Sequence, residues 1–296
     1  MGDTIHLKAY AKINLGLDVL RRREDGYHEV KMIMQTVTLH DDLELRRTSE
    51  AGIRVENNLP YLPKNENNLA YRAAKILMDE FDIRDGMEIR LNKRIPVAAG
   101  MAGGSSDCAA VLWGMNLMYG LGLSMEELMA RGVRLGADVP YCLLRGTALA
   151  EGIGEKLKPL APMPRCMLLI ARPNINVSTR FVYENLHVDE LRPEQHPDVD
   201  ALVGALERKD LLFLASHMGN VLAGVTEPLH PVIGSIRQCM MENGALGALM
   251  SGSGPTVFGI YKTRAAVSSA YVALKNSGLA KQVFTAAPYN IHKRRM

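Results

Sequence analysis

A glycine-rich segment, "PVAAGMAGGSSD" at residues 96–107, contains the residue types best suited to holding an anion. Glycine lets the backbone approach a ligand closely and direct several N–H groups at one phosphate. Ser105, Ser106 and Asp107 precede an apolar segment typical of a helix, and the free amides at a helix start favour phosphate. The segment therefore predicts a phosphate-binding loop, and a turn that merely packs a helix is the alternative interpretation.

The order of residues in this loop excludes the two commonest nucleotide-binding motifs. A P-loop ends in Gly-Lys-Ser or Gly-Lys-Thr, whereas this segment ends in Gly-Ser-Ser-Asp. A dinucleotide-binding fold needs the spacing GxGxxG, and this segment has GxxGG. A phosphate held here would therefore belong to another class of nucleotide enzyme.

Two charged residues, Lys12 and Asp138, could act on a group held by this loop. Lys12 lies on the polar face of a predicted strand, together with Asn14 and Asp18. Asp138, in "GADVP", follows a predicted helix and precedes an apolar segment, where a buried carboxylate needs a cation such as Lys12. A solvated lysine and a turn-capping aspartate are the alternative interpretations.

Two turns carry further candidates for ligand contact. "DGYH" places Tyr27 and His28 on a hairpin turn, where aromatic side chains more often contact a ligand or partner than the core. "SGSGPT", at residues 251–256, is a second glycine-rich turn between two predicted strands. A plain hairpin is the alternative for the second turn.

The elements that must position these residues follow from the hydrophobic pattern. In the first half, alternation predicts a long strand at 4–20 that is buried on one face, with the odd-numbered residues inside. We expect further strands at 30–39, 43–45, 53–55, 86–96 and 141–152, and helices at 67–81, 105–120 and from Ser124 to the turn "GADVP". The helix at 105–120 is apolar nearly all round, which predicts that it is buried.

The second half shows the same mixture of elements. "PLAPMP" at 159–164 is the best candidate for a hinge. Strands are predicted at 166–173, on either side of "SGSGPT" and at 281–287, and helices at 178–186, 198–218, 231–243 and 263–278. Strands and helices do not alternate strictly, so the pattern favours an α+β fold.

Three of these segments together resemble the motifs of the GHMP kinase family: "AKINL", "PVAAGMAGGSSD" and "SGSGPTVFG". The resemblance implies a two-domain α+β fold, with a ribosomal-protein-like N-terminal α/β domain at 1–162 and a ferredoxin-like C-terminal domain at 163–296. It also implies an active site in the cleft between the halves and ATP-dependent phosphorylation of an alcohol on a small molecule. ATP would arrive as its Mg²⁺ complex, with the hydroxyl of Ser105 or Ser106 as a candidate ligand of the metal.

The resemblance assigns roles to residues that match the family's motifs. Lys12 and Asp138 would be the catalytic pair. The phosphates of ATP would be held by eleven consecutive residues: Pro96, Val97, Ala98, Ala99, Gly100, Met101, Ala102, Gly103, Gly104, Ser105 and Ser106.

A longer stretch, "AKINLGLDVLRRREDGYHEVKMIMQTV", resembles the branch of the family that phosphorylates a cytidine diphosphate conjugate for isoprenoid precursor synthesis. The implied substrate-binding residues are Asn14, Tyr27, His28, Tyr183, Gly252 and Ser253, with Phe181 as the alternative to Tyr183 for the second stacking aromatic. The alternative function is that of another small-molecule kinase of the family, of the mevalonate or homoserine type.

The composition of the 296 residues bounds what else the chain could be. It is 47% hydrophobic and 23% charged. The net charge of +3 is too small to favour a nucleic-acid-binding protein. The only support for that alternative is two basic runs, at 21–23 and 292–296. The four cysteines form no CxxC pair, the first residues "MGDTIHLK" lack the core of a signal peptide, and no apolar run approaches the ~20 residues of a membrane span. We therefore expect a cytoplasmic monomer or homodimer that binds a small molecule and neither nucleic acid nor a membrane.

Overall fold

A computed structural model describes residues 3–290 and divides the chain into two compact units that interleave along the sequence. The basic run at 292–296 lies outside the described residues. The first unit is built from three segments: Met1–Ala11, His40–Val97 and Ala102–Leu144. The second unit is built from the other three: Lys12–Leu39, Ala98–Met101 and Arg145–Met296.

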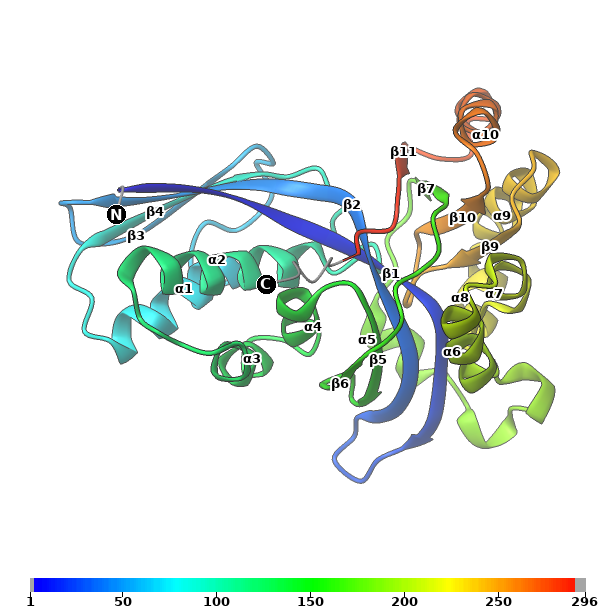
Figure 1. Ribbon diagram of the computed structural model, residues 1–296, viewed down its shortest axis with the longest axis horizontal. Coiled ribbons are helices and arrows are strands. Elements are labelled where there is room, and N and C mark those ends of the chain that lie inside the picture. Colours follow the sequence, from blue (N-terminus) through cyan, green and yellow to red (C-terminus); the bar gives the residue numbers. More distant parts are fainter. Residues whose placement is uncertain (1–2, 291–296) are drawn as a thin grey trace. The chain divides into compact units, whose positions relative to one another are not determined.

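Two long strands, β1 (Thr4–Arg22) and β2 (His28–Thr48), contribute residues to both units (Figure 1). The borders of the compact units therefore differ from the predicted single boundary after residue 162. β2 joins the predicted strands at 30–39 and 43–45 into one, because the polar Asp41 between them is buried and hydrogen-bonded.

β1 differs from the prediction in its burial. We expected one buried face, yet from Ala11 to Val19 every residue is buried. Helix α6 (Val199–Arg208) accounts for part of this, since a Cβ placed on Gly16, on the polar face, would lie 2.7 Å from Leu202 Cδ1. The polar face of the predicted strand is thus covered by protein.

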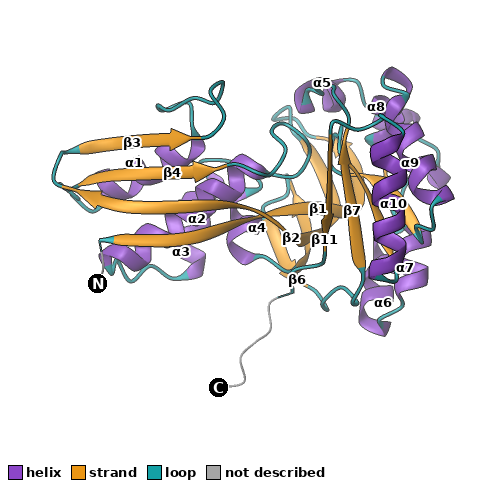
Figure 2. Cartoon of the chain, turned by 90° about the horizontal axis from the view of Figure 1, so that it is seen from above, coloured by secondary structure: helices purple, strands orange, loops and turns teal. Residues whose placement is uncertain are grey.

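In the first unit, β3 (Gly52–Asn57) runs parallel to β4 (Gly86–Asn92), and β4 runs antiparallel to β2. Helices α1 (Leu69–Glu80) and α2 (Gly103–Tyr119) cover one face of this sheet (Figures 1 and 2). The absence of a side chain at Gly114 lets α2 pack closely against β1, since a Cβ on Gly114 would lie 2.4 Å from the Cδ1 atom of Leu7 in that strand. The expected burial of α2 is confirmed.

Asn68 is the N-cap of α1, where its side chain accepts a hydrogen bond from the Ala70 N–H group. Ser124 and Glu127 form a capping box at the start of α3 (Met125–Val133). The buried stripe of α1 is formed by Ala70, Ala73, Ala74 and Leu77. Phe81, the C-cap residue of α1, is exposed.

The predicted strand at 141–152 is wrong in its first part. Residues Val139–Leu144 form the buried helix α4, and only Thr147–Gly152 form a strand, β5. Arg145 and Gly146 separate the two elements with positive φ angles of 63° and 74°. A continuous apolar run fits a buried helix as well as a buried strand, so periodicity could not decide between them.

In the second unit, β5 pairs with β2 and with β6 (Lys156–Pro159). Four further strands form an antiparallel sheet in the order β11-β7-β10-β9: β7 (Met167–Arg172), β9 (Gly247–Met250), β10 (Val257–Tyr261) and β11 (Gln282–Ala286). Helices α9 (Val232–Glu242) and α10 (Arg264–Asn276) lie on one face of it (Figure 2). This order and the split β-α-β connections are those of a ferredoxin-like domain, as expected.

The segment between β7 and β9 contains most of the local differences from prediction. The expected helix at 198–218 is two helices, α6 and α7 (Leu211–His217), because Lys209 adopts a left-handed conformation and Asp210 caps α7. Two short elements were not predicted: β8 (Gly219–Asn220) and α8 (Ala223–Leu229). The remaining elements here are α5 (Thr179–Glu184) and the 3₁₀ turns Val188–Glu190 and Pro193–Gln195. None of the helices in residues 3–290 has both the length and the apolar character that crossing a bilayer requires.

Candidate active site

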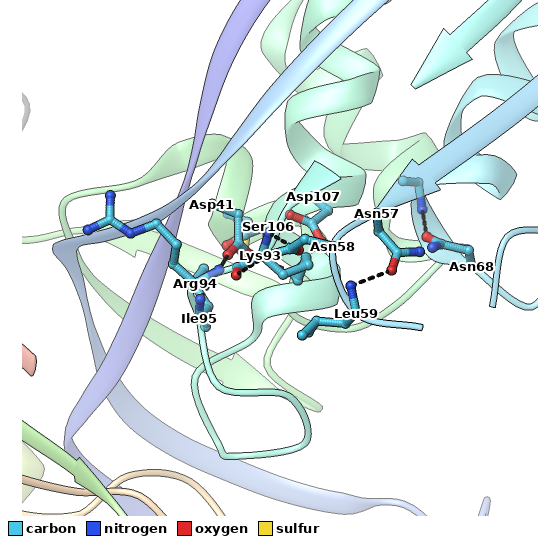
Figure 3. Close-up of polar contacts among 12 residues, drawn as sticks. Asp41, Asn57, Asn58, Leu59, Asn68, Lys93, Arg94, Ile95, Ser106 and Asp107 are labelled. Atoms are coloured by element: carbon cyan, nitrogen blue, oxygen red, sulfur yellow. Dashed lines mark hydrogen bonds and ion pairs between the residues drawn. The ribbon is translucent and has the colours of Figure 1, made fainter. Parts of the chain in front are cut away.

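In the first unit, a buried ionic cluster of Asp41, Lys93 and Asp107 lies at the two ends of the glycine-rich loop (Figure 3). The Lys93 Nζ atom contacts the carboxylates of both aspartates. Asp41 also accepts hydrogen bonds from the backbone N–H groups of Arg94 and Ile95, the latter at 2.8 Å. The residues that enter the loop and the first turn of α2 that leaves it are therefore joined through one lysine.

The cluster places two carboxylates around one ammonium, and all three side chains are buried. Burial raises the pKa of Asp107 to about 8, and Lys93 opposes that rise while the charge on Asp41 adds to it. Burial alone would lower the pKa of Lys93, but the two carboxylates outweigh it and raise that pKa. The Asp107 Oδ1 atom is buried without a hydrogen-bond partner among the described residues. The folded chain therefore holds a proton on Asp107 more readily than it would on an exposed carboxyl.

The start of α2 is open in the way that anion binding requires. Its N-cap, Ala102, has a left-handed φ of 56° and provides no side-chain hydrogen bond to the helix. The backbone N–H groups of Gly103, Gly104 and Ser105 have no acceptor one turn earlier in a helix, so they are available to a ligand. Ala98 also has a positive φ, of 50°, and such strain at non-glycine residues is typical of functional loops.

The two loop serines have different environments. The Ser106 hydroxyl is buried, donates to the Tyr10 carbonyl oxygen and lies 3.3 Å from Cys142 Sγ. Ser105 is partly exposed and makes no side-chain hydrogen bond within the described residues. Of the two candidate metal ligands, Ser105 therefore has the hydroxyl that is free to bind. Residues 3–290 contain no group of three or more His, Cys, Asp or Glu side chains that could hold a metal ion.

Asp138 is half-buried and immediately precedes α4. Its backbone carbonyl accepts a hydrogen bond from the Cys142 N–H group at 3.0 Å. Its carboxylate forms no hydrogen bond or ion pair within residues 3–290, so the turn-capping interpretation is not supported. Both carboxylate oxygens remain available to an external partner.

In the second unit, Lys12 is buried, with only 5% of its surface exposed, so the interpretation as a solvated lysine is wrong. Its Nζ atom donates to Asn14 Oδ1 at 2.7 Å, and its backbone N–H donates to the Met101 carbonyl at 3.2 Å. It makes no ion pair within the described part of the chain. A buried ammonium with one amide oxygen as partner is costly unless an anion completes its environment.

The second glycine-rich turn lies against the tip of the loop. The Ser251 hydroxyl donates to the Gly100 carbonyl oxygen at 3.0 Å. A Cβ placed on Gly100 would lie 2.1 Å from the Ser251 carbonyl oxygen, and one placed on Gly252 would lie 3.6 Å from Lys12 Nζ. The turn does join two antiparallel strands, as a plain hairpin would, but it also brings its backbone against the loop and the lysine.

The aromatic candidates form a separate group on the second unit. The rings of His28 and Tyr183 lie with centroids 5.2 Å apart, while Tyr27 is 61% exposed and Phe181 is 46% exposed. Burial, and secondarily the charge on Arg22, lowers the pKa of His28, so its ring is neutral at pH 7. Of the two aromatic candidates on α5, Tyr183 is the one beside His28.

The structure thus brings Lys12, Asn14, Gly100 and Gly252 together within the second unit. Asp138 belongs to the first unit, so its pairing with Lys12 stays a prediction. Sequence reasoning did not identify Asp41 and Lys93, or three residues around the second turn: Thr179, Asn220 and Thr226. The position of Lys93 three residues before the loop was the one signal that could have found any of them.

Comparison with known proteins places this geometry in context. The sequence matches the family models described as GHMP kinases N terminal domain, over residues 68–146, and GHMP kinases C terminal, over residues 202–280. It is 54% identical over 283 residues to a protein from Lachnospira eligens named 4-diphosphocytidyl-2-C-methyl-D-erythritol kinase, covering 96% of this chain and 98% of that protein.

Two solved structures resemble the fold. A crystal structure of 4-(cytidine 5'-diphospho)-2C-methyl-D-erythritol kinase has a TM-score of 0.81 and 35% identity, covering 97% of this chain and 100% of that chain. A homoserine kinase from Cytophaga hutchinsonii has a TM-score of 0.78 and 21% identity, covering 98% of this chain and 96% of that chain. At that identity, the second likeness shows a shared fold alone.

Proposed function

The chain belongs to the GHMP kinase family, and we propose that it transfers the γ-phosphoryl group of ATP to the 2-hydroxyl of 4-diphosphocytidyl-2-C-methyl-D-erythritol, a step of non-mevalonate isoprenoid precursor synthesis. Close relatives over nearly the whole chain carry the name of this kinase. In the structure, the observation that carries the proposal is the buried Lys12 beside the tip of the glycine-rich loop. We expect the protein to act in the cytoplasm as a monomer or homodimer.

The loop at 96–106 would hold the phosphates of ATP. The open N–H groups at the start of α2 would donate to the terminal phosphates, and the dipole of this long helix favours their negative charge. The ionic cluster supports this role because it joins the residues at both ends of the loop. A preformed cradle of this kind places the transferred phosphoryl group without the cost of ordering the loop at each turnover.

Lys12 and Asp138 would act on the reacting groups. Phosphoryl transfer proceeds through a loose transition state in which alignment and charge stabilisation matter more than covalent catalysis. The Lys12 ammonium would stabilise the charge that develops on the transferred group. The Asp138 carboxylate, with both oxygens unoccupied, would orient the acceptor hydroxyl and take its proton late in the reaction.

Mg²⁺ fits the loop as a companion of ATP. When bound with ATP, it would supply positive charge beside the phosphates, and it needs few protein ligands because it retains several waters. The Ser105 hydroxyl, partly exposed and without a partner next to the open amides, is the protein group suited to contact it.

The cytidine end of the substrate would be bound by the aromatic group. A pyrimidine that stacks between Tyr27 and Tyr183 would gain ~1–3 kcal/mol. The neutral ring of His28 has one N–H donor and one acceptor nitrogen, which can read the donor and acceptor edge of cytosine. Asn14, Gly252 and Ser253 lie in the same unit and would contact the substrate between its base and the reacting hydroxyl.

The acceptor specificity decides between this function and its alternatives. Purified protein should turn over ATP with the diphosphocytidyl substrate at least 100-fold faster than with mevalonate or homoserine. Equal rates with all three acceptors would contradict the proposal. A nucleic-acid-binding role has little support in the described residues, since Arg21 and Arg23 are paired with Glu29 and Asp25; RNA binding with steep salt dependence would be needed to revive it.

A further inference from the structure

A buried asparagine, Asn220, directs both of its side-chain donor hydrogens at the backbone around the second glycine-rich turn. Its Nδ2 atom donates to the carbonyl oxygens of Met250 and Gly252, each at 2.8 Å. Its Oδ1 atom accepts the Leu222 N–H at 3.0 Å. An amide is the one uncharged side-chain group that can supply two donors and an acceptor in this geometry.

A second side chain of the same segment reaches the same turn. Thr226, in α8, is 1% exposed, and its single hydroxyl hydrogen is shared between the carbonyl oxygens of Ser253 and Leu222, each 3.2 Å from the Oγ1 atom. Together, Asn220 and Thr226 donate hydrogen bonds to three backbone carbonyl oxygens at the turn, those of Met250, Gly252 and Ser253. The backbone of the turn is therefore fixed from the β8–α8 side.

The turn lies close to the tip of the loop and to the Lys12 side chain. A Cβ on Gly252 would lie 3.3 Å from the Gly100 Cα atom and 3.6 Å from Lys12 Nζ, and Gly252 itself has a φ of 58°. The Ser251 hydroxyl bonds to the Gly100 carbonyl. A displacement of the Gly252 carbonyl would therefore be transmitted to the Lys12 ammonium and to the tip of the loop.

We propose that Asn220 is a positioning residue of the phosphoryl-transfer site, which holds the Gly252 carbonyl and thereby sets the positions of Lys12 Nζ and of Gly100. Asn220 lies in a two-residue strand that pairs with β1 at Gly16 and Leu17, so it is tied to the strand that carries Lys12. The inference rests on the proposed kinase function. It predicts that loss of the Asn220 amide impairs the chemical step more than substrate binding.

Asn116 provides a matched control. It is 8% exposed against 9% for Asn220, and its amide likewise bonds to backbone, donating to the Leu123 carbonyl at 2.9 Å and accepting the Leu123 N–H at 3.0 Å. It lies near the C-terminal end of α2, thirteen residues after Gly103, which is roughly 20 Å along the helix. Its substitution removes similar hydrogen bonds without touching the turn.

The experiment compares N220A and N116A by thermal unfolding and by steady-state kinetics with ATP and the diphosphocytidyl substrate. Both variants should lose stability to a similar degree. N220A should lower kcat by about 100-fold while the KM of each substrate changes by less than about threefold. N116A should keep kcat within about threefold of the wild type. Equal kcat values for N220A and N116A would overturn the inference.

A milder variant keeps the test decisive if N220A does not fold. T226V removes only the Thr226 hydroxyl and preserves the shape of the side chain, so it should lower kcat by about fivefold without changing KM. N220S, whose shorter hydroxyl cannot replace both amide donors, should also lower kcat. Unchanged kcat in both T226V and N220S would then overturn the inference. A wild-type protein that does not phosphorylate the diphosphocytidyl substrate would instead contradict the proposed function, so the two failures are distinguishable.

Discussion

At the scale of single residues, burial distinguishes the charged groups that serve the site from those that face solvent. Lys12 is buried against one amide oxygen, whereas Lys75 is 55% exposed and pairs with Asp79 in the usual way of a surface helix. A charged group that is buried without a countercharge is destabilising, so its presence points to an anionic ligand. Asp138, in the first unit, is a second charged residue whose side chain has no partner within residues 3–290.

We predict that Asp138→Asn lowers kcat by about 100- to 1,000-fold, because an amide cannot accept the proton of the acceptor hydroxyl. ATP affinity should change little, since Asp138 is outside the loop that would hold the phosphates. Steady-state kinetics and calorimetric titration with a non-hydrolysable ATP analogue would measure both quantities. Asp79→Asn, on the exposed face of α1, serves as the control and should leave kcat unchanged. Near-normal turnover of D138N would remove Asp138 from the catalytic site.

The raised pKa of Asp107 predicts how stability depends on pH. The folded chain binds this proton up to about pH 8, whereas an unfolded carboxyl loses it near pH 4. Between these values the folded state binds more protons, so stability should fall as pH rises, by at most about 1.4 kcal/mol per unit. Thermal melts from pH 5 to 9 should show this decline in the wild type and a flatter profile in Asp107→Asn. Parallel profiles of the two proteins would show that Asp107 is not the group responsible.

At the scale of elements, the site depends on turns that bring backbone against backbone. The loop tip and the turn after β9 approach so closely that a Cβ on Gly100 would lie 2.1 Å from the Ser251 carbonyl oxygen and one on Gly252 would lie 3.3 Å from the Gly100 Cα atom. Both Gly100 and Gly252 have positive φ angles, of 73° and 58°, which add a conformational reason for glycine. The helix that follows the loop and the strand that precedes it are joined by the Lys93 cluster.

Gly100→Ala should therefore impair stability and activity more than the strain of its positive φ angle alone would predict. Its Cβ would lie 2.1 Å from the Ser251 carbonyl, which must move away. Gly122→Ala is the matched control, because Gly122 has a similar φ of 70° and open space around it. Gly122→Ala should lower the free energy of unfolding by about 1 kcal/mol through φ strain, and Gly100→Ala should lower it further, as measured by denaturant unfolding. G100A alone should lower kcat/KM for ATP, by more than about 100-fold; similar kinetics in both variants would contradict the close contact.

At the scale of the whole molecule, the two compact units share β1 and β2. Each unit obtains strand residues from the same two continuous segments, Thr4–Arg22 and His28–Thr48. The predicted boundary after residue 162 lies between the regions matched by the two family models, but the compact units cut across it. Evolutionary domains and compact units are thus different divisions of this chain.

We predict that the protein unfolds in one transition. Trp113, the single tryptophan, lies in α2 of the first unit, so its fluorescence reports on that unit, while far-ultraviolet circular dichroism reports on both. The two signals should change at the same urea concentration, because the shared strands couple the units. Midpoints that differ beyond experimental error would show that the units unfold independently.

Much of the fold could be predicted because local patterns carried it. The alternation of apolar and polar residues predicted β1, a helix was predicted to start at Ser124, where α3 begins, and the glycine content predicted the position of the loop. The errors lie where a local pattern fits two structures: the apolar run after Asp138 became α4 before β5, and the polar Asp41 did not interrupt β2. Whether both faces of a strand are buried depends on the elements that pack over it, and the periodicity of the strand's own residues does not report those elements.

The amino-acid sequence by itself determined the family, the position of the glycine-rich loop and the types of residue that could perform the reaction, because these depend on composition and spacing within short segments. Only the tertiary structure decided that Lys12 is buried beside Gly252, that Lys93 joins the ends of the loop, and that Asn220 holds the second turn. These contacts join residues from 14 to 240 positions apart, such as Lys93 with Asp107 and Lys12 with Gly252. Long-range proximity is a property of packing, and no local pattern in the chain encodes it.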